Sequence, residues 1–409
     1  MATGYVQRTI EPLLRRSAAE FPAVTLTGPR QSGKTTLLRR VFGESHQYVS
    51  LADPEVRAWA LGDPRDFLAR HPAPVILDEV TYAPDLLHYV MGLIDSDRSA
   101  KGCFILSGSQ NLGLVAAVSE SLAGRTDVLR LFPLTDRELD RDPGRSLFWD
   151  RDPLVAREAL AAPVRDAWGR FLQGYYPEVA LDTHRDAYRW HAAYATTYLE
   201  QDVRSLRAVG DLAGFQSFMQ LLAARTATVL DLTALSRDLG VAVNTIKGWL
   251  SVLEATHQVF FLRPDAFNAS RRMVKRPKLY FLDIGTVCYL TGLRDVEHAA
   301  RGPMAGQIVE TAVVAEVYKA YAHLGLTPAL SFWQTAHGVE VDLVIRDAGR
   351  VVPVEVKSAG TANRRWADGV RTFRSLETQG VPDAGYVVHP GDTAIGLGDG
   401  VLALPLREL

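Results

Sequence analysis

Residues 28–36, GPRQSGKTT, match the phosphate-binding loop pattern G-x-x-x-x-G-K-[ST] at all four fixed positions. Backbone N–H groups of such a loop and of the following helix point together at phosphate oxygens. Lys34 would reach the β- and γ-phosphates, and the hydroxyl of Thr35 would ligate Mg²⁺. A strand-to-helix turn that binds nothing is the alternative. We expect ATP and Mg²⁺ at this loop, with contacts from Gly28, Pro29, Arg30, Gln31, Ser32, Gly33, Lys34, Thr35 and Thr36.

Two acids, Asp78 and Glu79, end an apolar segment that begins at residue 74. The segment predicts a buried strand, which would place Asp78 at the carboxyl edge of a parallel sheet. Asp78 could there complete the Mg²⁺ shell opposite Thr35. Glu79 could polarise the attacking water as a general base. For this segment alone, solvated acids after a buried strand are the alternative.

A third apolar segment, residues 102–106, turns polar at its end. A hydroxyl or an amide at this place would lie beside Asp78 and could sense the γ-phosphate or orient water. Ser107, Ser109 and Gln110 are the candidates, and their spacing does not choose among them. We take Ser107 as the first of them.

Arg125 follows a predicted helix over residues 111–122 and precedes a predicted strand. In ring-forming ATPases this helix end faces the nucleotide of the neighbouring subunit, so Arg125 is a candidate arginine finger. The alternative is a cation that complements the helix dipole. A finger requires an oligomer, and we expect a homo-oligomer.

Acids and a lysine also gather near the C-terminus. Apolar residues alternate around Asp342 and again around Glu355 and Lys357, which predicts two strands joined by a short turn. Side chains in a strand alternate with period two, so Glu355 and Lys357 share a face. Such carboxylates can hold Mg²⁺ or Mn²⁺, and a lysine beside them can position or deprotonate water. A hairpin whose outward charges only pair is the alternative.

The elements around the first loop have the order that its chemistry requires. Residues 21–27 predict a buried strand and residues 36–42 a helix, and further strands are predicted at 47–51 and 102–106. A helix over residues 5–20 would lie on the edge of the sheet. This order predicts an α/β P-loop core over residues 1–143, with a parallel sheet and helices on both faces.

The composition is that of an ordinary globular protein. The 409 residues are 47% apolar and 22% charged and carry a formal charge of −2, which predicts two to four domains and no global basic field for nucleic acid. Cys103 and Cys288 are best explained as free thiols in a reducing cytosol. We see no signal peptide and no membrane span, and we expect a cytoplasmic protein without a membrane partner.

The middle of the chain predicts a helical region over residues 144–215 and a winged helix-turn-helix over residues 216–265. Asn244, Thr245 and Lys247 would begin the recognition helix. A linker with a basic stretch, residues 271–278, would follow over residues 266–300. DNA contact through this helix and stretch is one interpretation, and a lid that packs on protein with a solvated basic loop is the other.

The loop at residues 26–36, the acid pair at 77–79, the polar strand end at 106–109 and the runs at 121–125 and 132–135 resemble a family of prokaryotic AAA-type ATPases. Those proteins carry a C-terminal domain of uncharacterised function that is similar to restriction endonucleases. The resemblance implies an AAA-like sheet and a restriction-endonuclease-like domain over residues 301–409.

The restriction-endonuclease pattern is an aspartate followed by E-x-K. Asp342, Glu355 and Lys357 fit this pattern, and Glu310 matches the helix carboxylate that often joins the metal site. The resemblance therefore implies an ATPase coupled to DNA binding or processing through a nuclease-like domain. A nucleotide-controlled oligomeric switch that binds protein or DNA without nuclease activity is the alternative.

Overall fold

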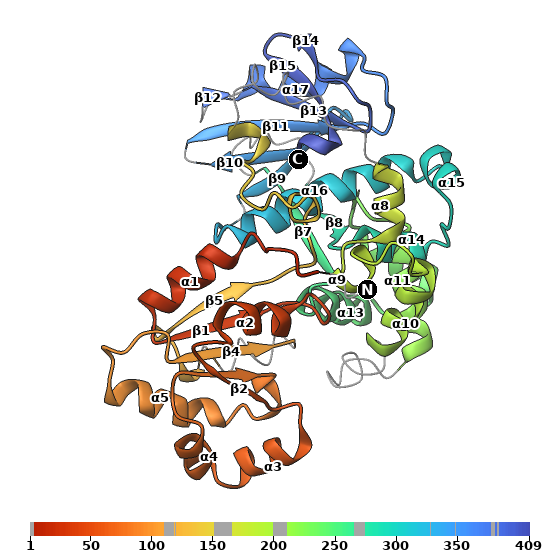
Figure 1. The fold of residues 1–409 in the computed structure, drawn as a ribbon. Helices are drawn as coiled ribbons and strands as arrows, with labels where there is room; N and C mark the ends of the chain where they lie inside the picture. The colour runs from red at the N-terminus through yellow and green to blue at the C-terminus, as the bar shows by residue number, and fades with distance from the viewer. Residues whose placement is uncertain are drawn as a thin grey trace.

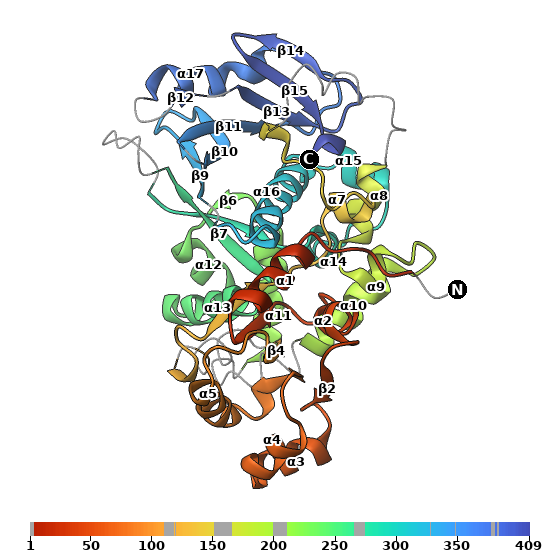
Figure 2. The ribbon, with the colours of Figure 1, turned by 60° about the vertical axis from the view of Figure 1, so that its left-hand side comes forward.

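The computed structural model describes residues 4–109, 118, 120–150, 166–198, 211–265, 275–327, 329–347, 349–377, 381–382 and 384–409. The N-terminal sheet and the C-terminal sheet lie at opposite ends of the molecule, and the helices of the middle region pack beside the junction between them (Figure 1). A second view shows α16 (Ala305–His323) at the centre, between the two sheets (Figure 2). No helix in these described ranges combines the length and the apolar character needed to cross a bilayer.

The N-terminal sheet has five strands, and every neighbouring pair in it is parallel. Its order is β2 (Gln47–Ser50), β3 (Val75–Asp78), β4 (Phe104–Gly108), β1 (Ala23–Thr27) and β5 (Thr126–Arg130). Strands β1, β3 and β4 are buried along their whole length, as expected for parallel strands covered on both faces. The predicted parallel sheet is confirmed.

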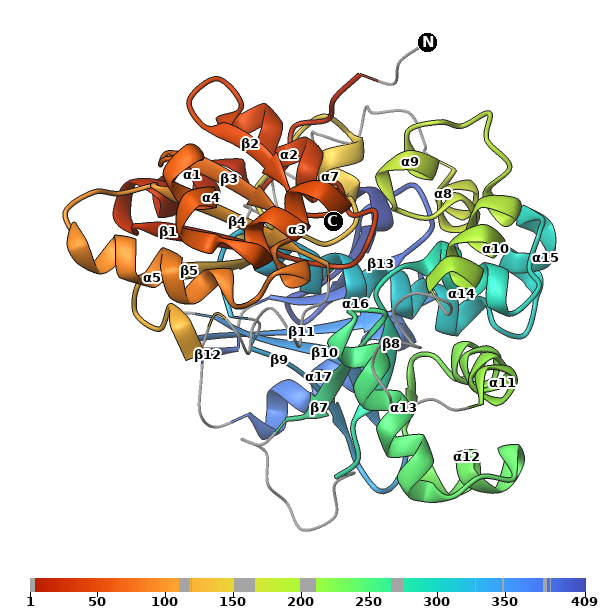
Figure 3. The same cartoon turned by 90° about the horizontal axis from the view of Figure 1, so that it is seen from below.

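Helices cover both faces of this sheet. Val24 and Leu26 point to the face covered by α1 and α2, whereas Ala23 points to the other face, since strand side chains alternate. Helices α3, α4 and α5 cover that second face (Figure 3). The bounds are α1 (Glu11–Glu20), α2 (Lys34–Phe42), α3 (Pro54–Gly62), α4 (Pro64–Arg70) and α5 (Leu86–Ser96). The fold is therefore an AAA-like α/β fold.

The middle region is helical, and its sheet joins that of the C-terminal region. Strand β8 (Lys278–Phe281) pairs antiparallel with β6 (Thr228–Val229) and β7 (Val259–Pro264), and β7 pairs parallel with β9 (Leu330–Gln334). The elements before β6 are α7 (Asp136–Leu139), α8 (Ala167–Gln173), α9 (Pro177–Ala180), α10 (Ala187–Tyr198) and α11 (Leu212–Ala223). Those from β6 to α15 are β6 (Thr228–Val229), α12 (Leu232–Leu239), α13 (Val243–Ala255), β7 (Val259–Pro264), β8 (Lys278–Phe281), α14 (Ile284–Leu290) and α15 (Val296–Arg301). The segment predicted as a linker thus contains β8, α14 and α15.

The C-terminal region is a mixed sheet between two helices. Strands β9, β10 and β11 are antiparallel neighbours, whereas β13 pairs parallel with β11 and with β15. Apolar residues of α16 pack on one face and those of α17 on the other. The bounds are β9 (Leu330–Gln334), β10 (Glu340–Asp347), β11 (Arg350–Val356), α17 (Asp368–Leu376), β12 (Val381–Pro382), β13 (Gly385–His389), β14 (Ile395–Gly398) and β15 (Val401–Pro405).

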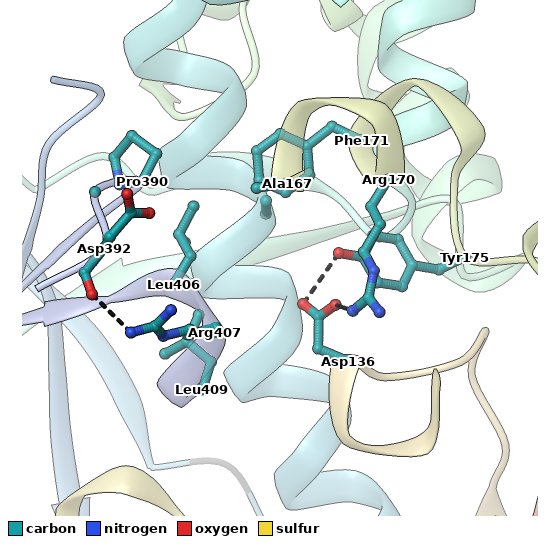
Figure 4. Close-up of a pocket in the computed structure, with 12 residues that line it drawn as sticks. Asp136, Ala167, Arg170, Phe171, Tyr175, Pro390, Asp392, Leu406, Arg407 and Leu409 are labelled. Carbon is teal, nitrogen blue, oxygen red and sulfur yellow. Dashed lines mark hydrogen bonds and ion pairs between the residues drawn. The ribbon is translucent and has the colours of Figure 1, made fainter. Parts of the chain in front are cut away.

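The three parts of the chain meet around Asp136 of α7. Its carboxylate accepts hydrogen bonds from Arg170 of α8 at 2.7 Å and from the hydroxyl of Tyr175 at 3.1 Å (Figure 4). Arg407, near the C-terminus, lines the same pocket and donates to the carbonyl of Asp392 at 2.6 Å. The pocket holds about 40 Å³, far less than the roughly 300–1,000 Å³ of ligand sites. This junction is packed and is not a site for a nucleotide.

Candidate nucleotide site and C-terminal carboxylate cluster

The backbone of the loop between β1 and α2 explains both fixed glycines of the motif. Gly28 has a φ of +148°, and a Cβ built on it would lie 2.1 Å from the carbonyl oxygen of Leu131. Gly33 has a φ of +93° and precedes the first residue of α2. Only glycine adopts both conformations without steric strain. The loop therefore has its shape because of these residues.

Lys34 begins α2, and its side chain crosses the loop. The side chain is buried, and Nζ donates to the carbonyl oxygens of Gly28 at 3.0 Å and Pro29 at 2.9 Å. A lysine ammonium is a point charge with three donors, so it can exchange carbonyl oxygens for phosphate oxygens. The contact of Lys34 with the β- and γ-phosphates stays a prediction.

Asp78 ends β3 and gathers hydroxyl groups from three elements. Thr35 Oγ1 and the hydroxyl of Tyr48 each donate to Oδ2 at 2.7 Å, and Ser107 Oγ donates to Oδ1. Burial and the hydrogen bond to Asp78 raise the pKa of Tyr48 to about 12. Carboxylate and hydroxyl oxygens are the hard donors that Mg²⁺ prefers. Asp78 and Thr35 therefore fit a magnesium ion, and Tyr48, in β2, is a member of the site that the sequence did not reveal.

Glu79 follows in the left-handed conformation, with a φ of +55°. Its Oε2 accepts hydrogen bonds from the backbone N–H and the hydroxyl of Ser109, both at 3.2 Å. A non-glycine residue with this φ is uncommon, and this backbone conformation directs Glu79 differently from the extended strand before it. Of the predicted sensing residues, Ser107 thus contacts Asp78 and Ser109 contacts Glu79, while Gln110 lies outside the described residues.

A cavity of about 740 Å³ lies over the loop, within the range of ligand sites. The loop contributes Arg30, Gln31, Gly33, Lys34, Thr35 and Thr36 to its lining, and Glu79 also lines it. Residues distant in sequence line it as well: Tyr5, Val6, Arg8, Pro177, Glu178, Leu181, Tyr194 and Thr197. Helices α9 and α10 therefore contribute to the cavity over the loop, which the sequence did not indicate.

Arg8 joins the loop to the rest of the molecule. Its guanidinium donates to the carbonyl oxygens of Ser32 at 2.9 Å and Phe132 at 2.7 Å, and Nε lies 3.1 Å from Glu138 Oε1. Glu138 Oε1 also lies 3.5 Å from Nδ1 of His323, in α16. Burial would raise the pKa of Glu138, but Arg8 and His323 hold it well below its usual range. Glu138 is therefore a buried carboxylate that ties the loop, α7 and α16 together.

Arg125 lies far from the loop of its own chain. Its carbonyl oxygen accepts from the N–H of Ala23 at 3.2 Å, so it sits at the amino edge of the sheet, opposite the loop. The side chain donates to both carboxylate oxygens of Asp95, at 2.9 and 2.8 Å. Hydrogen bonds from Arg125 and Arg98 lower the pKa of Asp95 to about 2. An arginine finger at Arg125 stays a prediction, and it would act on another subunit.

The C-terminal acids come together as the hairpin predicts. Asp342 of β10 accepts from the N–H of Val356 at 2.9 Å, and Lys357 Nζ lies 2.5 Å from Glu355 Oε1. Burial and the neighbouring Asp342 raise the pKa of Glu310 and of Glu355 to about 8. We call Glu310, Asp342 and Glu355 the carboxylate cluster.

An ammonium group stands among these acids. Lys278 Nζ lies 2.8 Å from Glu310 Oε1 and 3.3 Å from Asp342 Oδ1. Burial would lower the pKa of Lys278, but Glu310 and Asp342 raise it, so the side chain is cationic. In the described parts of the chain, no three His, Cys, Asp or Glu side chains are arranged to hold a metal ion. The cluster in this arrangement does not fit a divalent metal.

The same contacts correct part of the prediction for the basic stretch. Both interpretations of this stretch place Lys278 at the surface, but its side chain is 4% exposed and is paired with acids. Arg276 pairs with Asp231 at 2.7 Å. Lys275 is exposed, and residues 271–274 lie outside the described residues. Asn244 and Lys247, at the start of α13, are exposed.

Comparison with known families divides the chain into three parts. Residues 20–139 match a family described as AAA domain. Residues 165–297 and 305–409 match two families described as domains of unknown function, DUF8612 and DUF4143.

Two curated relatives match nearly the whole chain. They are uncharacterised proteins of Mycobacterium bovis and Mycobacterium tuberculosis, each 29% identical over 396 residues, which cover 97% of this chain and 82% of theirs.

Solved structures show a distant likeness. A Walker-type ATPase of Pyrococcus abyssi is 14% identical with a TM-score of 0.45, over 71% of this chain and 99% of that one. A RuvB protein of Thermotoga maritima is 17% identical with a TM-score of 0.32, over 62% and 89%. The Orc1 protein of Aeropyrum pernix in complex with DNA is 17% identical with a TM-score of 0.27, over 71% and 94%.

Because these TM-scores are low, the assignment of the N-terminal domain rests on the family match and on the geometry of the loop. A parallel sheet with helices on both faces, the loop after β1 and the acids after β3 lie within the matched residues. Residues 20–139 therefore form an AAA-type P-loop ATPase domain, and ATP binding and hydrolysis are the activities that this domain supports.

Proposed function

We propose that this protein hydrolyses ATP with Mg²⁺ and that its nucleotide state controls the contacts of the C-terminal region. Lys34 would leave its carbonyl partners for the β- and γ-phosphates. Glu79 would take a proton from the attacking water, with Ser109 holding its carboxylate. Thr35 and Asp78 would hold the magnesium ion, which supplies positive charge beside the β- and γ-phosphates when it is bound.

The observation that carries the control of the C-terminal region is the buried path that starts at the loop. Ser32 contacts Arg8, Arg8 contacts Glu138, and Glu138 lies against His323 at the end of α16. All of these side chains are buried. A change in the loop on nucleotide binding would therefore reach α16 through groups that cannot relax into water.

Two more contacts bind α16 to the segment after β5. Glu316 accepts from the N–H of Asp136 at 2.9 Å, and Lys319 donates to the carbonyl oxygen of Leu134 at 2.7 Å. The first turns of the same helix carry Glu310 of the carboxylate cluster. A shift of α16 would therefore change both its contacts with the segment after β5 and the position of Glu310 in the carboxylate cluster.

Hydrogen exchange tests this function. A non-hydrolysable ATP analogue should change the exchange of α16 amides in wild-type protein, and the change should be much smaller in His323→Ala although the analogue still binds. His298→Ala, at an exposed position of α15, is the matched control and should respond as wild type does. If the analogue at saturating concentration leaves the hydrogen exchange of α16 amides in wild-type protein unchanged, the nucleotide does not control the C-terminal region through α16.

DNA is the candidate partner for the middle and C-terminal regions. The order α11, β6, α12, α13, β7 and β8, with exposed Asn244 and Lys247, supports a winged helix-turn-helix.

The order α16, β9, β10, β11, α17 and β13 supports the restriction-endonuclease-like fold that the sequence predicts. Nicking of supercoiled plasmid with Mg²⁺ or Mn²⁺ would favour a nuclease if Asp342→Ala and Lys357→Ala abolish it. The position of Lys278 favours the switch without nuclease activity.

A further inference from the structure

Lys278 reaches the carboxylate cluster from outside the C-terminal region. It begins β8, whereas Glu310 lies on α16 and Asp342 on β10. Its ammonium lies 2.8 Å from Glu310 Oε1, 3.3 Å from Asp342 Oδ1 and 3.9 Å from Glu340 Oε2. Three carboxylates therefore surround one cation that the chain itself provides.

An aromatic ring also lies near the ammonium. Nζ lies 5.6 Å from the centre of the Phe332 ring, and Phe332 is fully buried. The face of an aromatic ring attracts an ammonium group but supplies no oxygen ligand. Mg²⁺ and Mn²⁺ prefer oxygen ligands and keep several waters, which this wall does not accommodate. The surroundings thus suit an ammonium group better than a divalent ion.

The strand that carries Lys278 is held from both sides. Lys278 is in register with Leu262 of β7 on one side and with Val229 of β6 on the other. Its neighbour Tyr280 is fully buried and donates its hydroxyl to Glu310 Oε1 at 2.7 Å. The pairing fixes the backbone of Lys278, and the ion pairs with Glu310 and Asp342 hold its ammonium in place.

We infer, on the restriction-endonuclease-like fold of the proposed function, that Lys278 is the resident cation beside Glu310 and Asp342 of the carboxylate cluster, in place of the divalent metal of such a site. The ammonium pairs with Glu310 and Asp342 and thereby binds the strands of the middle region to the C-terminal region. A hydrolytic metal has no place in the cluster while Lys278 is there. With Lys278 in this position, the described part of the C-terminal region has no metal-dependent nuclease site.

Binding of Mn²⁺ to the full-length, nucleotide-free protein tests this inference by electron paramagnetic resonance. Wild type and Asp342→Asn should bind the same amount of Mn²⁺, since the cluster holds none in either protein. A Mn²⁺ site that is present in wild type and lost in Asp342→Asn would overturn the inference. This comparison stands even if substitutions of Lys278 prevent folding.

A substitution that removes the ammonium gives the second arm of the Mn²⁺-binding experiment. Lys278→Met should gain about one Mn²⁺ per chain, because the freed carboxylates can then act as ligands, and the double variant with Asp342→Asn should lose it. Lys275→Met removes an exposed lysine of the same segment and should bind as wild type does. If Lys278→Met folds but binds no more Mn²⁺ than wild type, the result would contradict the inference that Lys278 excludes the metal.

Discussion

The guanidinium of Arg8 lies 3.1 Å from the carboxylate of Glu138, and both side chains are buried. The pair joins the segment before α1 to α7, which follows the last strand of the N-terminal sheet in the sequence. Both partners make further contacts, Arg8 with the loop and Glu138 with the N–H of Thr9 at 2.7 Å. Loss of one partner therefore leaves the charge of the other buried without its counter-ion.

Glu138→Gln should lower the free energy of unfolding by about 3–5 kcal/mol, the usual cost of leaving one partner of a buried ion pair uncompensated. Urea denaturation followed by circular dichroism measures it. Glu178→Gln removes an exposed partner of Arg185 and is the matched control, with an expected cost of under about 1 kcal/mol. Equal stability of both variants would contradict the importance of the buried pair.

The destabilisation by Glu138→Gln should also depend on pH. The pKa of Glu138 is lower in the folded protein than in the unfolded chain, so its contribution is present above the unfolded pKa of about 4.3 and is lost as the pH falls toward the folded pKa. The difference in unfolding free energy between wild type and variant should therefore shrink below about pH 4. A constant difference from neutral to acid pH would show that the charge of Glu138 is not what stabilises the fold.

Lys34→Ala and Glu79→Gln should separate nucleotide binding from hydrolysis. Lys34→Ala removes the cation of the loop and should weaken ATP binding, measured by calorimetry. Glu79→Gln keeps the size of the side chain and its hydrogen bonds as an acceptor, so binding should persist while turnover falls by about 10²–10⁴-fold. Equal phosphate release by wild type and both variants would refute these roles.

Mixing of inactive variants tests the arginine finger. Arg125→Ala and Lys34→Ala should each be inactive alone, but together they should recover part of the activity, because one mixed interface then has an intact loop facing an intact arginine. Arg98→Ala also removes a partner of Asp95 but should stay active. Absence of recovery in a proven mixed oligomer would leave Arg125 as a structural partner of Asp95.

DNA binding through α13 should be electrostatic and sensitive to salt. Lys247→Ala should weaken binding and reduce the slope of log affinity against log salt by about one. Arg237→Ala, an exposed cation on α12, is the control, and its slope should match that of wild type. Binding that is absent or independent of salt would favour the protein-packing lid.

The N-terminal domain could be predicted from the sequence because its signals are local. A nine-residue loop with fixed glycines and acids directly after a buried strand predicted the positions of Lys34, Thr35 and Asp78 relative to one another. Tyr48 and Arg8 could not be found in this way, since each reaches the site from an element that has no motif. Their contacts depend on the order of the strands and on the path of the N-terminal segment.

The C-terminal region shows the same limit more strongly. The short turn between two predicted strands predicted that Asp342 lies near Glu355 and Lys357, and β10 and β11 are indeed neighbours. The sequence also placed Lys278 in a basic stretch, where neighbouring cations suggested solvent and DNA. Its burial comes from the pairing of β8 with β7 and of β7 with β9, which no spacing in the sequence encodes.

Pairing of β7 with β9 has a mechanical consequence. Strands that share backbone hydrogen bonds move together, so a displacement of β7 or β8 would pass to β9 and the C-terminal sheet. The five-stranded sheet shares no strand with this ten-stranded sheet. Residues 131–135 follow β5, and their backbone is held to α16 by His323 and Lys319. Movement of one sheet against the other would therefore strain these two contacts.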